Sequence, residues 1–178
     1  MSNTNKKVLI AYYSRKGNNY VGGSIVNLPI GNTEVIAKKI QAFIGGDLFE
    51  IDTVKPYPID YTATTNVAKD ELRENLRPQL THTVKNMDDY EVIYLGYPNW
   101  WGTFPMAVFT FLESYDFSGK TIIPFCTHGG SQFGDALSVL KKLCPTAKIL
   151  KGIVIRDSSV QNSENDIHKW LKELGMIK

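Results

Sequence analysis

Four apolar stretches of the chain have the length of β-strands and are almost uninterrupted by polar residues. They cover residues 8–13, 92–97, 121–126 and 149–155. Runs of this kind are typical of strands that are covered on both faces, as in a parallel sheet. A weaker pattern at residues 47–51 places Leu48 and Phe49 next to acidic positions. We therefore expect five strands.

Between these strands, apolar residues recur at the spacing of amphipathic helices. One helix is predicted after the first strand, with Asn32 or Thr33 as its N-cap and Gly45 and Gly46 ending it. Pro105 opens another helix at its first turn, and two more patterns cover residues 133–140 and 167–174. Strands that alternate with helices predict an α/β fold with a parallel sheet and right-handed crossovers.

Two segments interrupt this alternation. Residues 17–30 follow the first strand as an insertion, and residues 53–89 follow the second strand. The longer segment contains a predicted helix at residues 67–75, and the pattern leaves the role of both segments open. The chain shows no internal repeat, so we expect one domain over residues 1–178.

Composition and charge exclude several classes of protein. Hydrophobic residues make up 43% of the 178 positions and charged residues 21%, as in ordinary globular proteins. No apolar run reaches the roughly 18 residues that a membrane span needs, and the polar start indicates no secretory signal, so a cytoplasmic protein is expected. The net charge of +2 is too small and too scattered to indicate nucleic-acid binding. Cys126 and Cys144 form no metal-ligand pattern and are expected to be buried thiols, so no metal site is predicted.

The first candidate loop follows the first strand. Ser14 and Lys16 precede the insertion, and Gly31, Asn32 and Thr33 lead into the first helix. Hydroxyl groups and backbone N–H groups at a helix N-terminus form an anion site. The same residues also suit an ordinary helix cap, so the loop alone indicates a phosphate site and a simple cap about equally. The absence of GxGxxG and GxxxxGK[ST] argues against a dinucleotide or a nucleoside triphosphate.

A second loop follows the third strand and is rich in aromatic residues. Its predicted ligand-binding residues are Pro98, Asn99, Trp100, Trp101, Gly102 and Thr103. A loop has few places to bury two adjacent indoles, whereas indole rings suit a flat heteroaromatic ligand. A satellite hydrophobic cluster or an oligomer contact is the alternative interpretation.

A third loop follows the fourth strand, with Thr127, Gly129 and Gly130 as its candidate ligand-binding residues. Glycines let the backbone approach the edge of a planar ring and present N–H and C=O groups to it. His128 is a possible proton donor, although a lone loop histidine is more often solvated. Ligands of open α/β sheets bind at the carboxyl ends of the strands. Along the chain, the loops at these strand ends follow the order phosphate loop, aromatic loop and glycine loop. This is the order that a flavin mononucleotide (FMN) requires.

These motifs resemble the flavodoxin-like family over nearly the whole chain. Trp101-Gly102-Thr103 is similar to the Trp-Gly-Asp loop of that family, in which the Trp stacks on the flavin. The resemblance implies FMN rather than FAD and a doubly wound five-stranded sheet in the order 2-1-3-4-5 with helices on both faces. Gly17-Asn18 and Gly31-Asn32 both fit the Gly-Asn pair of the family, and we choose the second because a helix follows it directly.

The sequence leaves three hypotheses about function. The leading hypothesis is a flavodoxin-type electron-transfer flavoprotein that passes electrons to a redox partner protein, with no catalytic side chain. The alternative is an NAD(P)H-dependent FMN reductase that acts on a quinone or a similar small acceptor. The net charge of +2 favours the reductase, because shuttle flavodoxins are strongly acidic. A flavin-free binding module is the third hypothesis, and a homodimer is possible through the tyrosines of residues 53–89.

Overall fold

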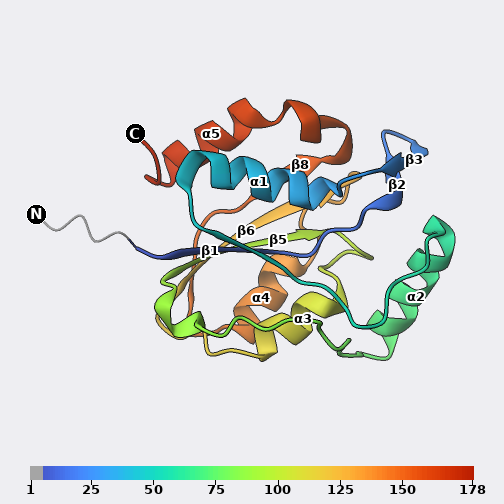
Figure 1. Cartoon of the computed structure of the whole chain (residues 1–178), viewed down its shortest axis with the longest axis horizontal. Helices are drawn as coiled ribbons and strands as arrows, with labels where there is room; N and C mark the ends of the chain where they lie inside the picture. Colours follow the sequence, from blue (N-terminus) through green and yellow to red (C-terminus); the bar gives the residue numbers. More distant parts are fainter. Residues whose placement is uncertain (1–5) are drawn as a thin grey trace, which may run out of the picture.

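A parallel sheet forms the centre of the molecule in a computed structural model that describes residues 6–178 (Figure 1). Its strands lie in the order β4-β1-β5-β6, and β7 and β8 both pair with β6 at the far edge. The strands are β1 (Val8–Tyr12), β4 (Asp47–Glu50), β5 (Val92–Pro98), β6 (Thr121–His128), β7 (Lys148–Ile149) and β8 (Ile153–Arg156). The predicted α/β fold with its parallel sheet is confirmed, and the order agrees with 2-1-3-4-5.

The fifth position of the sheet differs from the single strand predicted at residues 149–155. It is split into β7 and β8, which pair with opposite ends of β6. The break lies opposite Pro124, between the paired positions Ile122 and Phe125 of β6. Proline has no N–H to donate to a strand ladder, so an interruption at this position has a direct cause.

Helices cover both faces of the sheet (Figure 1). On one face lie α1 (Asn32–Ile44) and α5 (Glu164–Glu173), and on the other lie α3 (Met106–Glu113) and α4 (Ala136–Leu143). The start of α1 corrects one prediction, because its N-cap is Gly31 and Asn32 is already helical. The cap role predicted for Asn32 or Thr33 passes to Ser14, whose Oγ accepts a hydrogen bond from the Glu34 N–H at 3.0 Å.

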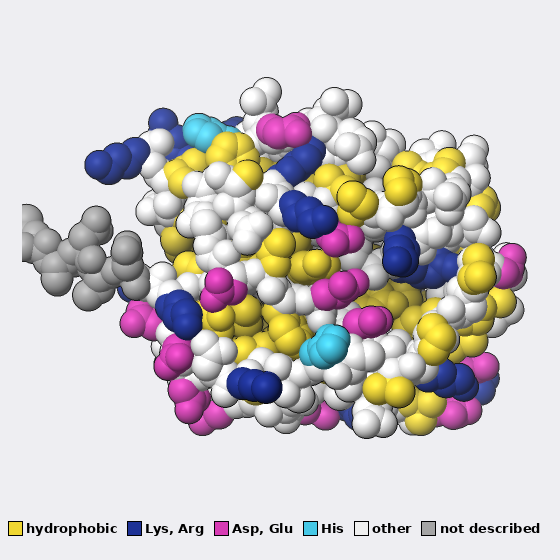
Figure 2. Space-filling view, viewed as in Figure 1, with side chains coloured by type: hydrophobic (Ala, Val, Ile, Leu, Met, Phe, Trp, Pro, Cys, Tyr) yellow, Lys and Arg dark blue, Asp and Glu magenta, His cyan; other side chains and the backbone are white. Residues whose placement is uncertain are grey.

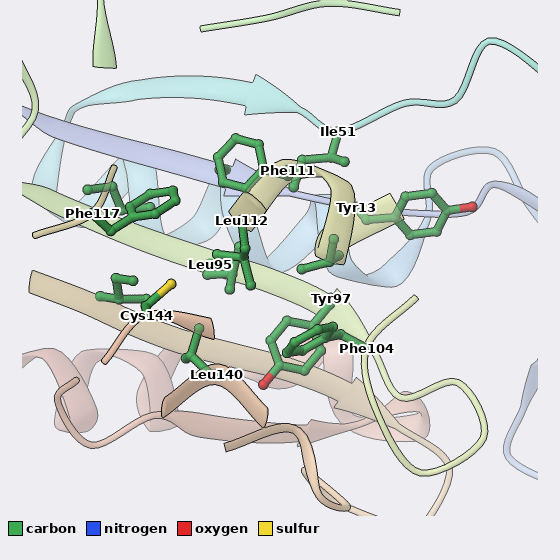
Figure 3. Packing of buried hydrophobic residues seen from close by; sticks show 14 of the residues in the cluster. Tyr13, Ile51, Leu95, Tyr97, Phe104, Phe111, Leu112, Phe117, Leu140 and Cys144 are labelled. Carbon is green, nitrogen blue, oxygen red and sulfur yellow. The ribbon is translucent and has the colours of Figure 1, made fainter. Parts of the chain in front are cut away.

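Alternating side chains of the strands build two hydrophobic cores. On β1, Ile10 points into the core beneath α1 and α5, whereas Leu9 and Ala11 point into the core beneath α3 and α4. Figure 3 shows the second core, where Leu95 of β5 lies close to Phe111 and Leu112 of α3. Burial on both faces explains why the strand sequences are continuously apolar.

The two inserted segments lie at the carboxyl edge of the sheet. Residues 17–30 contain an antiparallel hairpin of β2 (Gly17–Val21) and β3 (Ser24–Leu28), and the longer segment contains α2 (Tyr61–Arg73). The boundaries predicted for α2, 67–75, are wrong by six residues at its start. Asp60 caps the helix there by accepting a hydrogen bond from the Ala63 N–H at 2.7 Å. Short 3₁₀ helices, η1 (Met87–Asp89) and η2 (Asp157–Asn162), complete the chain.

Two further sequence-based expectations concern the cysteines and membrane-spanning segments. Cys126 and Cys144 are free and buried, as predicted. Burial raises the pKa of the Cys126 thiol to about 12, so the thiol is protonated at neutral pH. Among residues 6–178, no helix is long and apolar enough to cross a membrane.

Candidate functional site

A cleft opens at the carboxyl ends of β1, β5 and β6, where the three candidate loops meet. We call it the first cleft. It is bordered by the first turn of α1, the loops after β5 and β6, the β2–β3 hairpin and the start of α2. Its lining consists of Arg15, Asn19, Tyr20, Asn32, Thr33, Tyr61, Pro98, Asn99, Trp100, Thr127, His128, Gly129 and Asp157.

The start of α1 presents hydrogen-bond donors to this cleft. The backbone N–H groups of Asn32 and Thr33 have no hydrogen-bond partner among residues 6–178, whereas those of Glu34 and Val35 are bound to Ser14 and Gly31. Unpaired N–H groups and the helix dipole both favour an anion at this position.

Gly31 allows the chain to close tightly around the start of α1. A Cβ atom at this position would overlap Ser14 Oγ and would lie 2.7 Å from the backbone oxygen of Arg15. The φ of Gly31 is −64°, so the need for glycine comes from this close approach and not from its backbone conformation.

Trp100 stands on the inner side of the aromatic loop. Its ring packs edge-on against Tyr13 and Tyr57, with 5.2 Å between ring centroids in both pairs. Tyr57 Oη in turn donates a hydrogen bond to Glu71 Oε2 at 2.7 Å. These contacts fix the indole as a rigid wall of the first cleft, which suits stacking against a planar ligand.

Trp101 takes a different position from Trp100. Its side chain is 51% exposed, its backbone has a φ of +54°, and its Nε1 donates to the Thr65 backbone oxygen at 2.9 Å. Lys69 Nζ lies 5.2 Å from the centroid of the Trp101 ring. Trp101 therefore packs against α2 and does not line the first cleft.

Asn99 joins the aromatic loop to the glycine loop. Its Oδ1 accepts from the Gly102 N–H at 2.9 Å, its Nδ2 donates to the Gln132 backbone oxygen at 2.7 Å, and its own N–H donates to Thr127. Gly102 also accepts a hydrogen bond from Asp135 near the start of α4. The two loops are thus held at a fixed separation on either side of the cleft.

His128 at the end of β6 is held in one neutral form. Its Nδ1 accepts a hydrogen bond from the Gly130 N–H at 2.9 Å, so the neutral ring carries its hydrogen on Nε2. Burial, followed by the charge of Arg156, lowers the pKa of His128 below its usual value. At neutral pH the side chain is therefore a hydrogen-bond donor at the cleft.

The structure brings half of the predicted site residues to the first cleft. The predicted residues that line it are Asn32, Thr33, Pro98, Asn99, Trp100, Thr127 and Gly129. The predicted residues that do not line it are Ser14, Lys16, Gly31, Trp101, Gly102, Thr103 and Gly130. Ser14, Gly31 and Gly102 act behind the surface through the contacts described above.

Lys16, which the sequence places in the first candidate loop, faces a separate hollow that it shares with Glu34, Glu50 and Asp52. Figure 2 shows acidic side chains beside a hollow with a hydrophobic floor on the face of the molecule that it presents.

The two inserted segments bring further residues to the cleft. For Tyr20 and Tyr61 the sequence suggests only a contact with the substrate of a reductase, and the role of Arg15 was missed. Tyr20 of the hairpin stacks on Tyr61 of α2, with ring centroids 6.3 Å apart and an interplanar angle of 29°. Arg15 Nη2 donates to the Ile59 backbone oxygen at 2.9 Å and to Thr64 Oγ1 at 3.2 Å. No periodicity in the sequence shows that the insertions at residues 17–30 and 53–89 fold over the same edge. A useful signal was that both insertions follow strands whose carboxyl ends are adjacent.

Three comparisons place the chain among known proteins. A family model described as flavodoxin matches residues 7–174. A crystal structure of a protein from Bacteroides eggerthii, assigned as a flavoprotein, has 31% identity and a TM-score of 0.77 over 96% of this chain and 99% of its own. A flavoprotein from Lactobacillus acidophilus, solved in complex with FMN, has 21% identity and a TM-score of 0.64 over 90% of this chain and 99% of its own. No curated protein sequence gives a significant match.

Proposed function

Because this chain belongs to the flavodoxin family, we propose that it binds FMN non-covalently in the first cleft and transfers electrons on it. The observation that carries the proposal is the meeting of the three loops there. Unpaired N–H groups of α1 lie at one part of this cleft, and an indole and a glycine loop lie at another. The relative from Bacteroides eggerthii, assigned as a flavoprotein, supports a flavin ligand, and the Lactobacillus acidophilus protein binds FMN in a similar fold.

The phosphate is assigned to the start of α1. The N–H groups of Asn32 and Thr33 are unpaired, and Ser14 and Gly31 fix the loop around them. This site distinguishes FMN from riboflavin, because only FMN carries the phosphate dianion that the helix N-terminus stabilises.

The flavin ring is assigned to the space between the aromatic loop and the glycine loop. Trp100 offers the face of a rigid indole, and Thr127, His128 and Gly129 border the cleft on the side of β6. Bound FMN supplies the redox chemistry, and the protein sets its potential by stacking, hydrogen bonds and nearby charge. The neutral His128 provides an Nε2–H donor for this purpose.

Titration of the flavin-free protein with FMN, riboflavin and FAD tests this proposal. Flavin fluorescence and absorbance report binding, and we expect FMN to bind at least about a hundredfold more tightly than riboflavin because of its charge-assisted hydrogen bonds. Protein that takes up none of the three flavins would contradict the proposal. Equal affinity for FMN and riboflavin would contradict the assignment of the FMN phosphate to the start of α1.

A reductase that takes hydride from NAD(P)H and reduces a quinone or a similar small acceptor is the second candidate. It is favoured by a pocket of about 270 Å³ between α2 and the aromatic loop, which shares Asn99 and Trp100 with the first cleft. NAD(P)H oxidation by the FMN-loaded protein, with and without a quinone, distinguishes the two candidates. Turnover with the quinone supports the reductase, and its absence, together with photoreduction of the bound FMN, supports the electron shuttle.

A further inference from the structure

The second pocket, which we call the α2 pocket, adjoins the first cleft and shares with it Arg15, Asn19, Tyr61, Asn99 and Trp100. Thr64, Thr65, Ala68 and Trp101 line it, and none of these residues lines the first cleft. In turn, the residues assigned to the phosphate and to the glycine loop, such as Thr33 and Thr127, are absent from its lining. A molecule in the α2 pocket would therefore lie beside the proposed flavin site on the side of Trp100.

Arg15 lies between the two cavities and lines both. Its guanidinium donates to the backbone oxygens of Asn18, Pro58 and Ile59 and to Thr64 Oγ1. Nη1 makes the bond to Asn18 and Nη2 makes the other three, so Nε has no hydrogen-bond partner among residues 6–178. A guanidinium has five N–H donors, so Arg15 retains free donors although it is firmly positioned.

Within the described part of the chain, Arg15 forms no ion pair, and the nearest carboxylate that acts on its charge is the more distant Asp60. Arg73 forms an ion pair with Asp70, and Arg77 forms one with Glu113, whereas no carboxylate lies within 4 Å of Arg15. The lining of the α2 pocket also contains no Asp and no Glu. Burial lowers the pKa of Arg15, a sign that water only partly compensates its charge. A partly desolvated, unpaired guanidinium favours an anionic ligand.

The walls of the pocket specify the rest of the ligand. The rings of Tyr61, Trp100 and Trp101 border it, and Ala68 leaves room on the surface of α2. Trp101 is held in place by its hydrogen bond to the Thr65 backbone oxygen. Aromatic walls of this kind bind flat rings by offset or edge-to-face packing.

We propose that the α2 pocket is a binding site for a small planar aromatic anion, an aryl carboxylate, whose carboxylate pairs with Arg15 while its ring lies between Tyr61 and the two tryptophans. The site rests on the proposed function and deepens it, because a ligand bound there would lie next to the flavin ring assigned to the first cleft. Binding of the anion itself does not require bound FMN.

Calorimetric titration with 4-nitrobenzoate and with neutral 4-nitrobenzamide tests the site. The two probes share ring and size and differ in charge, and both the flavin-free and the FMN-loaded protein are titrated. We expect the anion to bind about tenfold more tightly or better in the wild type. In Arg15→Gln this preference should disappear. The matched control is Arg73→Gln on the exposed side of α2, which removes an equal charge and should keep the preference.

A second variant guards against loosening of the hairpin in Arg15→Gln. Thr65→Phe leaves every hydrogen bond of Arg15 in place and fills the pocket, so it should weaken both probes about tenfold or more while the melting temperature stays near that of the wild type. Equal binding of both probes by the wild type, or an anion preference that survives in Arg15→Gln, would overturn the proposal.

FMN and riboflavin titrations of Arg15→Gln separate this site from the phosphate site. If the variant loses FMN affinity and keeps riboflavin affinity, Arg15 serves the FMN phosphate and the proposal is wrong. If wild-type protein binds no flavin but prefers the anionic probe through Arg15, the proposed function fails and the pocket assignment stands.

Discussion

Thr33 Oγ1 and Thr127 Oγ1 lie 2.8 Å apart in the buried interior, where they join the first turn of α1 to the end of β6. Thr33 belongs to the proposed phosphate site, and Thr127 precedes the glycine loop. The hydroxyl pair therefore sets the distance between the parts of the cleft that would hold the two ends of an FMN molecule. Such a pair is stabilising only while both partners are present, because a buried hydroxyl left alone loses its hydrogen bond to water as well.

A double-mutant cycle on this pair tests the link. Thr33→Val and Thr127→Val alone should each lower the free energy of unfolding by about 1–3 kcal/mol, because each leaves one buried hydroxyl unpaired. The double variant should cost clearly less than the sum, since it removes both polar groups. Urea unfolding of the four proteins measures the coupling. Additive losses would show that the two hydroxyls do not depend on each other.

Gly31→Ala is expected to weaken FMN binding selectively. The new Cβ would overlap Ser14 Oγ, so the loop would have to move away from the start of α1. We expect about a tenfold loss of FMN affinity and little change for riboflavin, because the displaced N–H groups would face only the phosphate.

Gly129→Ala is the matched control for Gly31→Ala. Its Cβ would meet no atom closer than Asp157 Oδ2 at 3.4 Å, and Gly129 borders the proposed ring position. Any loss in this variant should be shared by FMN and riboflavin. A loss shared equally by both flavins in Gly31→Ala would contradict the phosphate assignment.

The two adjacent tryptophans should differ in their effect on flavin affinity. Trp100 lines the first cleft, whereas Trp101 leans on α2, so Trp100→Ala should weaken FMN binding by about 1–3 kcal/mol and Trp101→Ala by less. Fluorescence titration gives both affinities. Trp100→Phe keeps an aromatic ring against Tyr13 and Tyr57 and separates stacking from core damage. A larger loss in Trp101→Ala would return the stacking role to Trp101.

Trp100 and Trp101 show how much of the site can be predicted from the sequence. Continuous apolar runs predict the strands because burial on both faces leaves no polar positions, and the carboxyl-edge rule then predicts which loops meet. The pattern does not reveal which of two neighbouring indoles turns inward. That choice depends on the Thr65 backbone oxygen, which lies on a helix 36 positions away.

Arg15 and the start of α2 illustrate the second limit. Arg15 acts through the hairpin and through residues 58–64, so its role depends on contacts between segments distant in sequence. The first turn of α2 is rich in threonine and has no apolar periodicity, and only the Asp60 cap marks its start. Cap chemistry followed by weak helix formers is an ambiguous signal in a single sequence.

The depressed pKa of His128 predicts a specific dependence of stability on pH. Because the folded-state pKa lies below the unfolded value of about 6.5, the unfolded state binds more protons as the pH falls through this region. Well above pH 6.5, the titration of His128 therefore does not change the free energy of unfolding. As the pH drops below that value, it lowers this free energy. Replacement by Gln should remove this contribution and make the variant less sensitive to acid than the wild type between pH 7.5 and 5.5, a range of about two units around the unfolded pKa.

Urea midpoints at both ends of this pH range test the prediction, and the comparison with wild type cancels carboxylates that also titrate, such as Glu50 and Glu71. His82→Gln is the matched control, because His82 is exposed and makes no hydrogen bond within residues 6–178. If His128→Gln loses as much stability on acidification as the wild type does, then burial and Arg156 do not lower the pKa of His128 in the folded protein, and the prediction is wrong.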